Sequence, residues 1–175
     1  MSDTRSYRMQ CYVTELADAA QINAGIVAGF EALRDAPDLQ RSHFFAGRYE
    51  NVYVPEARLP ALGPVLEAAR RGAAEYLGRP GLELAVGFWL NEMGPGQVTL
   101  PHRHDEDDEL VSGVYYVQVP DQAGELVLTR GAVTARVTPA AGRFVFFPPD
   151  MLHEVTGNRG SGVRLSVGMN FGIRA

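Results

Sequence analysis

Eight short runs of apolar or alternating residues fill the second half of the chain, from Leu82 onward, and glycine or proline separates most of them. In order they are LAVGFWLNEM, QVTLPHRH, LVSGVYYVQV, ELVLT, AVTARVT, RFVFFP, LHEV and VRLSVGMNF. Such runs are typical of β-strands, in which successive side chains point to opposite faces. Eight strands in about ninety residues are what a double-sheet jelly roll requires. We therefore expect a mainly β fold, a double-stranded β-helix or cupin-like barrel, over residues 82–173.

The N-terminal part of the chain has a different pattern. Apolar residues recur at helical spacing in residues 15–36 and 62–77, which predicts two helices. Residues 43–54 are rich in aromatic and β-branched side chains, and residues 6–13 alternate, so each of these segments is predicted as a strand. Both helices are expected to pack on the outside of one sheet of the barrel.

No linker, repeat or low-complexity tract divides the sequence. Residues 1–175 are therefore predicted to form a single domain, in which residues 1–80 pack on the barrel core of residues 82–173. A chain of 175 residues is long enough to bury such a core without disulfide bonds.

The composition of the chain predicts its cellular compartment and argues against some classes of partner. The net charge of -5 argues against nucleic acid or an anionic membrane surface as a partner. Cys11 is the single cysteine, so it cannot form an internal disulfide. No apolar run is long enough to span a bilayer, and the first residues lack the apolar core of a signal peptide. These features predict a cytoplasmic protein.

Two histidines, His102 and His104, stand one residue apart in the second of the eight runs. In an extended strand, side chains two apart share a face, so both imidazoles are expected to point into one space. A third histidine, His153, lies about fifty residues further on, in the strand-like stretch FVFFPPDMLHEV. Imidazole suits iron, zinc, copper or nickel, and three protein ligands with open positions are typical of catalytic metal sites. The spacing predicts a metal site inside the barrel.

The same residues carry a family resemblance. Trp89 and Asn91, then His-x-His, SGVYYVQVP, GRFVFFPPDMLHEV, and finally Arg164 with Ser166 resemble the 2-oxoglutarate- and Fe(II)-dependent oxygenases. The similarity is greatest to a bacterial branch that carries His-x-His followed by LSGVYY, and it covers about the last ninety residues. It implies Fe(II) as the metal, 2-oxoglutarate as cosubstrate and O₂ as oxidant, with His102 as the first iron ligand and His153 as the distal one.

The resemblance also implies a site for the cosubstrate. Arg164, eleven positions after His153, matches the arginine that grips the remote carboxylate of 2-oxoglutarate, with Ser166 as its neighbour. A planar, permanently charged and bidentate donor suits that carboxylate. Tyr116 matches a tyrosine whose hydroxyl assists, and Asn91 is a weaker candidate for the same pocket. The alternative is that this face of the Arg164 strand faces solvent.

One position departs from the wider family. Most members have aspartate or glutamate where this chain has His104. Either three histidines bind the metal, or Asp105 from the acidic run DEDDE supplies an oxygen ligand. We favour three histidines, because the residue after His104 points to the other face unless the strand bulges. The rest of the acidic run is predicted to be a solvated loop.

Cupins offer a second resemblance. Gly96, His102, His104 and Glu109 fit the first cupin motif, in which the glutamate is a fourth metal ligand. The second motif fits less well, since Asp150 stands where a glycine belongs. This resemblance implies the same barrel but another function: a cupin-type metal-binding protein, either an oxygenase or isomerase that uses no 2-oxoglutarate or a non-catalytic sensor.

The leading functional prediction is a 2-oxoglutarate-dependent hydroxylase whose substrate is a small molecule or an amino-acid side chain. The short N-terminal part leaves little room for a separate recognition domain. An exposed sheet edge is compatible with a homodimer. His43 is predicted to be a packed or surface residue rather than a ligand. Arg48 and Glu50 could reach the barrel mouth and touch substrate, but a surface ion pair is the default prediction. Trp89 fits either the core or the pocket.

Overall fold

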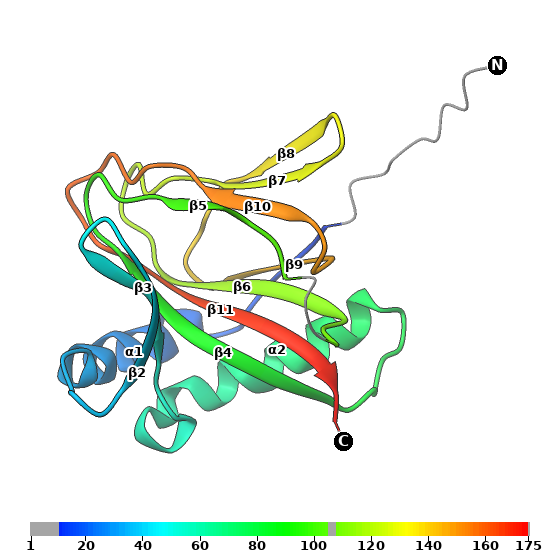
Figure 1. The fold of residues 1–175 in the computed structure, drawn as a ribbon. Helices are drawn as coiled ribbons and strands as arrows, with labels where there is room; N and C mark the ends of the chain where they lie inside the picture. Colours follow the sequence, from blue (N-terminus) through cyan, green and yellow to red (C-terminus); the bar gives the residue numbers. More distant parts are fainter. Residues whose placement is uncertain (1–10, 105–107, 175) are drawn as a thin grey trace.

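The computed structural model of the protein describes residues 11–104 and 108–174, and its centre is a pair of antiparallel sheets (Figure 1). The larger sheet has the order β1-β9-β6-β11-β4-β3-β2 and the smaller one the order β5-β10-β7-β8. The larger sheet comprises β1 (Tyr12–Glu15), β9 (Arg143–Phe147), β6 (Val111–Gln118), β11 (Arg164–Ile173), β4 (Leu84–Met93), β3 (Arg48–Tyr53) and β2 (Gln40–Phe45). The smaller sheet comprises β5 (Thr99–His102), β10 (Leu152–Val155), β7 (Leu126–Arg130) and β8 (Val133–Val137). Strands β4 to β11 coincide with the eight predicted runs, and the double-stranded β-helix is confirmed.

Strand β11 is the centre of the larger sheet. It pairs with β4 from Arg164↔Met93 to Ile173↔Leu84, and with β6 on its other side. Because side chains alternate along a strand, one of its faces meets the helices and the other meets the barrel interior. The same alternation separates Tyr115, which packs in the helix-side core, from Tyr116, which packs between the sheets.

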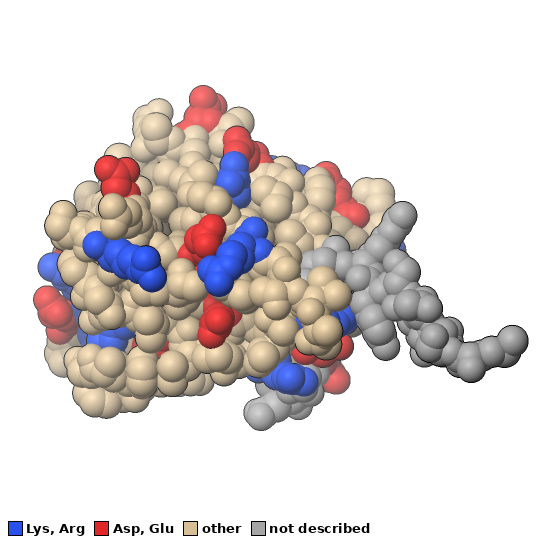
Figure 2. Space-filling model, turned by 90° about the horizontal axis from the view of Figure 1, so that it is seen from above, with Lys and Arg blue, Asp and Glu red and all other residues tan. Residues whose placement is uncertain are grey.

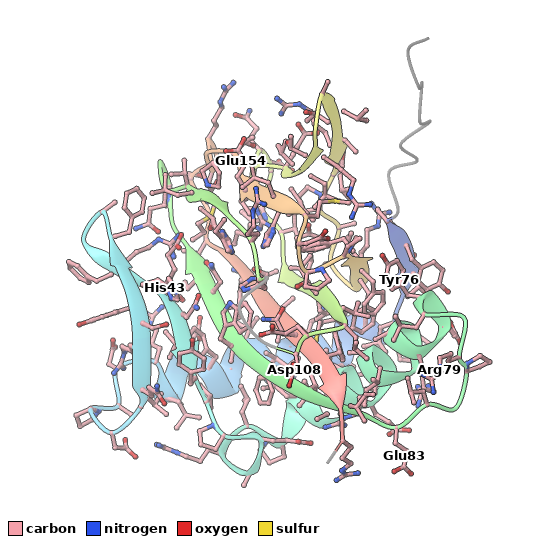
Figure 3. All side chains as sticks on the ribbon, turned by 45° about the vertical axis from the view of Figure 1, so that its right-hand side comes forward. His43, Tyr76, Arg79, Glu83, Asp108 and Glu154 are labelled. Atoms are coloured by element: carbon pink, nitrogen blue, oxygen red, sulfur yellow. The ribbon has the colours of Figure 1, made fainter. Side chains whose placement is uncertain are left out.

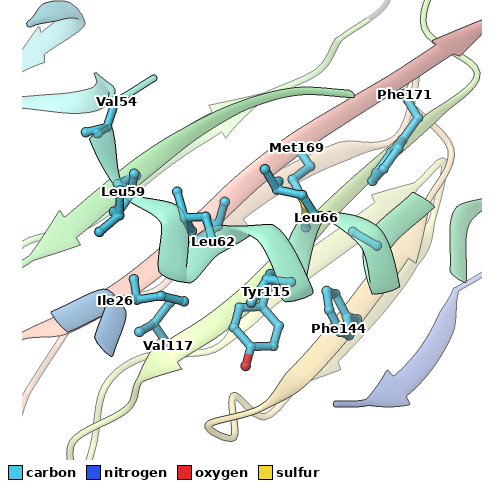
Figure 4. Packing of buried hydrophobic residues seen from close by; sticks show 14 of the residues in the cluster. Ile26, Val54, Leu59, Leu62, Leu66, Tyr115, Val117, Phe144, Met169 and Phe171 are labelled. Atoms are coloured by element: carbon cyan, nitrogen blue, oxygen red, sulfur yellow. The ribbon is translucent and has the colours of Figure 1, made fainter. Parts of the chain in front are cut away.

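Two helices cover the outer face of the larger sheet, as predicted (Figure 1). They are α1 (Ala19–Leu33) and α2 (Gly63–Tyr76), and α2 follows two short 3-10 turns, Glu56–Arg58 and Pro60–Leu62. Figure 4 shows Leu62 and Leu66 of this segment packed over residues of the sheet. None of the described helices is both long and apolar enough to cross a membrane.

The segment predicted as one strand over residues 43–54 is instead a hairpin of β2 and β3. Ala46 and Gly47 form its turn, with φ of 49° and 80°. Two successive residues with positive φ match the right-handed twist of the flanking strands, and glycine adopts this conformation at little cost. The strand predicted over residues 6–13 lies mostly outside the described residues, and β1 begins at Tyr12.

A second, smaller core fills part of the space between the sheets. It contains Tyr116, Leu126, Leu128, Val145, Phe147 and Met151. On the outer face of the smaller sheet, acidic and basic side chains are interspersed, and Figure 2 shows no large patch of one sign among the described residues. The rest of the space between the sheets is a cavity that opens beside the β2–β3 hairpin.

Gly72 tests how closely α2 packs on the sheet. A Cβ at Gly72 would stand 2.6 Å from a ring carbon of the fully buried Phe146, whereas one at Gly63, in the same helix, would meet only Glu56 Oε1 at 3.7 Å. We expect Gly72→Ala to lower the free energy of unfolding by about 1–2 kcal/mol, because overpacking outweighs the better helix propensity of alanine. Gly63→Ala should cost less, because its Cβ would meet only the end of a flexible side chain and the restriction imposed by Pro64. Urea unfolding of both variants checks this, and an equal response of the two would contradict it.

Candidate metal centre

Three imidazoles converge where the smaller sheet closes on the cavity. His102 ends β5 and His153 lies in β10, and the two are direct partners in the antiparallel ladder. His104 follows two residues after His102. The ring nitrogens of the three lie within 4.8 Å of one another. Their ring centroids are 4.1 Å apart for His102 and His153, 5.1 Å for His102 and His104, and 5.2 Å for His104 and His153.

His104 reaches this group by a route that strand alternation did not predict. Strand β5 ends at His102, so His104 lies outside it. Its backbone N–H donates to the carbonyl oxygen of Pro149 at 2.8 Å, which holds the segment against the loop before β10. The expected convergence therefore occurs, but a hydrogen bond between loops positions His104, not the period of a strand.

Backbone carbonyls orient two of the rings. Nδ1 of His102 lies 2.8 Å from the carbonyl oxygen of Leu100, and Nδ1 of His153 lies 2.9 Å from that of Met151. A carbonyl oxygen can only accept, so Nδ1 carries the proton in each neutral ring and Nε2 keeps its lone pair. This arrangement is common among metal-binding histidines, because it fixes both the tautomer and the ring orientation.

Burial keeps His153 neutral. The side chain is only 7% exposed, and this desolvation, reinforced by His102, lowers the pKa of His153 to about 3. A neutral imidazole is the form that binds a metal ion. At neutral pH, His153 is therefore ready to act as a ligand without first losing a proton.

The imidazoles line a cavity of about 640 Å³. Its polar wall includes Glu50, Asn91, Glu109, Ser112, Ser166 and Asn170, and its aromatic wall includes Phe44, Trp89 and Phe147. Trp89 lies with its ring centroid 5.7 Å from that of His104. Its indole lies across Gly168 of β11, where a Cβ would collide with the ring. Both residues line the cavity, so Trp89 belongs to the pocket. A cavity of this size accommodates a small molecule or a single side chain.

Arg164 and Tyr116 lie inside the barrel, behind this cavity. Arg164 is 2% exposed and Tyr116 is fully buried, and the guanidinium carbon is 5.1 Å from the centroid of the tyrosine ring. Neither residue lines the cavity, but Ser166, two positions along the same face of β11, does. The alternative prediction that this face of the strand faces solvent is therefore wrong.

Several polar atoms of this pair have no partner. Nε of Arg164 and the hydroxyl of Tyr116 are buried without a hydrogen bond, and Nη1 of Arg164 donates only a long bond of 3.5 Å to Ala123 O. Burial lowers the pKa of Arg164 and raises the pKa of Tyr116 to about 12. Unpaired polar groups at this depth are costly, which makes the pair a ready site for an anion.

Arg48 and Glu50 correct a prediction. They were expected as a surface ion pair, but their side chains are 11% and 12% exposed. Nη2 of Arg48 donates to Oε1 of Glu50 at 3.3 Å, and Nη1 donates to Oδ1 of Asn91 at 3.2 Å and to Glu92 O at 3.0 Å. Arg48 thus fastens the β2–β3 hairpin to β4. Asn91 lines the cavity while its side-chain oxygen is held by Arg48.

Glu109, one of the two predicted oxygen ligands, does not join the three imidazoles. Glu109 lines the cavity, but among the described residues the metal-binding group consists of histidines alone. Asp105 lies outside the described residues. His43, labelled in Figure 3 on the hairpin, also lines the cavity but stays apart from the group. Its Nδ1 lies 2.8 Å from Oγ of Ser42.

Similarity to a known family covers the barrel. Residues 88–172 match the family model of the 2OG-Fe(II) oxygenase superfamily. This segment runs from β4 to β11 and contains all three imidazoles together with Arg164 and Tyr116. The resemblance seen in the sequence is therefore confirmed. No curated protein matches the sequence.

Solved structures share the fold at low identity. A Pseudomonas putida prolyl-4-hydroxylase is 22% identical, with a TM-score of 0.66 over 95% of this chain and 94% of its own. The carbocyclase SnoK from nogalamycin biosynthesis is 14% identical, with a TM-score of 0.74 over 93% of this chain and 79% of its own. The epimerase SnoN, solved with Fe³⁺ and α-ketoglutarate, is 18% identical, with a TM-score of 0.66 over 95% of this chain and 80% of its own. Because these names cover three reactions, the shared fold alone does not fix the reaction.

The lowered pKa of His153 predicts a pH-dependent stability. Between about pH 6.5 and 3, unfolded His153 takes up a proton that the folded protein excludes, so the free energy of unfolding falls as the pH falls. From pH 7 to pH 5 the metal-free protein should lose about 2 kcal/mol more than His153→Asn does. Urea unfolding in the presence of a chelator measures this difference. An equal loss in both proteins would show that His153 protonates freely in the folded state.

Metal binding should quench the fluorescence of Trp89. It is the single tryptophan of the chain and its ring lies 5.7 Å from that of His104, so an open-shell ion beside the imidazoles lies within quenching range. Anaerobic titration with Fe(II) should quench the wild type, while His153→Ala should weaken binding at least about a hundredfold. His43→Ala, which removes the histidine outside the group, is the matched control and should bind like the wild type. Unchanged binding by His153→Ala would contradict the three-imidazole site.

Proposed function

We propose that this chain, an oxygenase of the 2OG-Fe(II) superfamily, hydroxylates a small molecule or an amino-acid side chain with the aid of Fe(II) and 2-oxoglutarate. The observation that carries the proposal is the meeting of three imidazoles at the cavity, with a buried guanidinium behind it. Metal, cosubstrate and substrate would then have adjoining places in one barrel.

His102, His104 and His153 would hold the metal. Three imidazole nitrogens on one side leave the other coordination positions open, and imidazole is a donor that Fe(II) accepts. When bound, Fe(II) with O₂ and 2-oxoglutarate supplies the oxidation that converts the cosubstrate to succinate and carbon dioxide and hydroxylates the substrate. The chain's own contribution is to keep His153 neutral by burial and to orient the rings of His102 and His153 through the carbonyls of Leu100 and Met151.

Arg164 and Tyr116 would bind the far carboxylate of 2-oxoglutarate. The guanidinium offers paired N–H donors, and the tyrosine hydroxyl, with its raised pKa, stays protonated and can donate as well. A carboxylate there would satisfy Nε of Arg164 and the hydroxyl of Tyr116, both of which lack partners. Ser166 lies on the same face of β11 as Arg164 and lines the cavity. It would therefore lie beside the cosubstrate as this molecule extends from Arg164 toward the metal.

Among the described residues no carboxylate joins the imidazole group, which gives the proposed site a distinctive charge. With three neutral ligands, a divalent ion keeps its full charge of about two, where a carboxylate ligand would cancel about one unit. The anionic keto acid end of the cosubstrate would compensate for that charge. Cosubstrate binding and metal binding should therefore reinforce each other.

A cupin-type metal protein that uses no 2-oxoglutarate is the second candidate. The group of three histidines, which no carboxylate of the described residues joins, favours it. Glu109, which that family would use as a fourth ligand, stands outside the group. The cupin alternative also leaves the buried Arg164 and Tyr116 without a role.

The chelate of iron and 2-oxoglutarate tests the proposal directly. With Fe(II) bound anaerobically, adding 2-oxoglutarate should produce a weak visible charge-transfer band. Arg164→Ala should raise the concentration of cosubstrate needed at least about tenfold, because one charge-assisted hydrogen-bonding partner is lost. Arg136→Ala, at a side chain that is 59% exposed on β8, is the control and should behave like the wild type.

Two results would count against the hydroxylase. One is a wild-type protein that holds iron but gives no band at saturating 2-oxoglutarate, which would favour the cupin alternative. The other is a band that Arg164→Ala and Arg136→Ala leave equally unchanged, which would remove the buried guanidinium from the cosubstrate site.

A further inference from the structure

Glu109 is a charged group of the cavity that no proposed role has used. Its side chain lines the same cavity as the three imidazoles. Its Oε2 atom is shielded from solvent and has no hydrogen-bond partner. Burying a carboxylate oxygen without a hydrogen bond costs free energy. A molecule bound in the cavity that donates a hydrogen bond to this oxygen would remove that cost.

The backbone on both sides of Glu109 is held against the larger sheet. Next to Glu109, the N–H of Leu110 donates to Phe171 O at 2.7 Å, which ties the loop to the end of β11. Strand β6 begins immediately afterwards, at Val111. The carbonyl oxygen of Asp108 stands close enough to Gly172 to be 3.4 Å from a Cβ placed there. Glu109 is thus carried on a segment that is fastened to two strands of the larger sheet.

None of the other described charged side chains of the cavity donates a hydrogen bond to Oε2 of Glu109. Glu50, the second carboxylate in the wall, already accepts from Arg48. His153 is neutral because burial lowers its pKa. Arg103 is exposed at the rim and does not hydrogen-bond to the buried oxygen of Glu109. The wall of the cavity therefore presents a carboxylate oxygen that a bound molecule could satisfy.

An aromatic ring is a second feature of the same cavity. Trp89 lines the same cavity beside His104, and it presents an indole to whatever binds near the metal. A carboxylate together with an aromatic face is the combination that recognises organic cations, through a charge-assisted hydrogen bond and a cation–π contact.

We propose that Glu109 sets substrate specificity by selecting a molecule that carries an ammonium group. This inference rests on the proposed function, because it takes the cavity as the substrate site of the hydroxylase. The ammonium would donate to Oε2 of Glu109 while the carbon to be oxidised faces the imidazoles. Glu109 is then a substrate-binding residue and not the fourth metal ligand of a cupin, in agreement with its position outside the imidazole group.

Trp89, as the single tryptophan, allows a test that needs neither substrate identity nor turnover. Benzylammonium and benzyl alcohol have the same size and ring but differ in charge. Both are titrated into the full chain at pH 7 while Trp89 fluorescence is followed. The variants are Glu109→Gln, which keeps the shape but removes the charge, and Asp108→Asn, the matched control at an exposed neighbour, labelled in Figure 3.

The wild type and Asp108→Asn should bind benzylammonium roughly tenfold more tightly than benzyl alcohol. Glu109→Gln should lose that preference. Equal or weaker binding of benzylammonium by the wild type would overturn the proposal without reference to any variant. A preference that survives in Glu109→Gln would overturn it as well.

The test is independent of the cosubstrate. Arg164→Ala should keep the preference for benzylammonium while it weakens the 2-oxoglutarate band. In the wild type, absence of the 2-oxoglutarate band with the preference for benzylammonium intact would contradict the hydroxylase but leave cation recognition by Glu109 standing. In the wild type, a 2-oxoglutarate band without the preference for benzylammonium would contradict cation recognition by Glu109 but leave the hydroxylase standing.

Discussion

The pairing of β5 with β10 is the interaction on which the rest of the site depends. These strands are about fifty residues apart in the chain, and their ladder sets His102 directly opposite His153. Neither histidine has a second imidazole within its own strand, so the imidazole group exists only when β5 and β10 pair in the smaller sheet. The bond from His104 N–H to Pro149 O then adds the third ring from the same junction. Pairing of β5 with β10 therefore brings the three imidazoles together.

The larger sheet supports this junction, and β11 shows how one strand serves stability and chemistry together. Its alternate residues Leu165, Val167, Met169 and Phe171 pack with the helix-side core. The residues between them, Arg164, Ser166, Gly168 and Asn170, face the space between the sheets. Packing of the helices against one face of β11 contributes stability. That stability offsets the cost of burying Arg164 Nε on the other face without a hydrogen-bond partner. A buried guanidinium is tolerable in such a frame when its ligand arrives with the opposite charge.

Much of this arrangement was predictable from the sequence, and the failures have physical causes. Alternation identified the eight barrel strands, and histidine spacing identified the convergent rings. The turn at Ala46 and Gly47 was missed because aromatic and β-branched residues continue on both sides of it. The burial of Arg48 with Glu50 follows from that hairpin folding against β4, which a local pattern cannot reveal. The position of Glu109 depends in the same way on a bond between Leu110 and Phe171, which are distant in sequence.

The central claim is that three imidazoles, and no carboxylate of the chain, hold the iron. X-ray absorption spectroscopy of the anaerobic Fe(II)-loaded protein, without 2-oxoglutarate, tests it most directly, because multiple scattering from imidazole rings reports how many of them bind. The account predicts three imidazoles, with the remaining positions taken by water. A spectrum that requires only two imidazoles together with a protein carboxylate would contradict it.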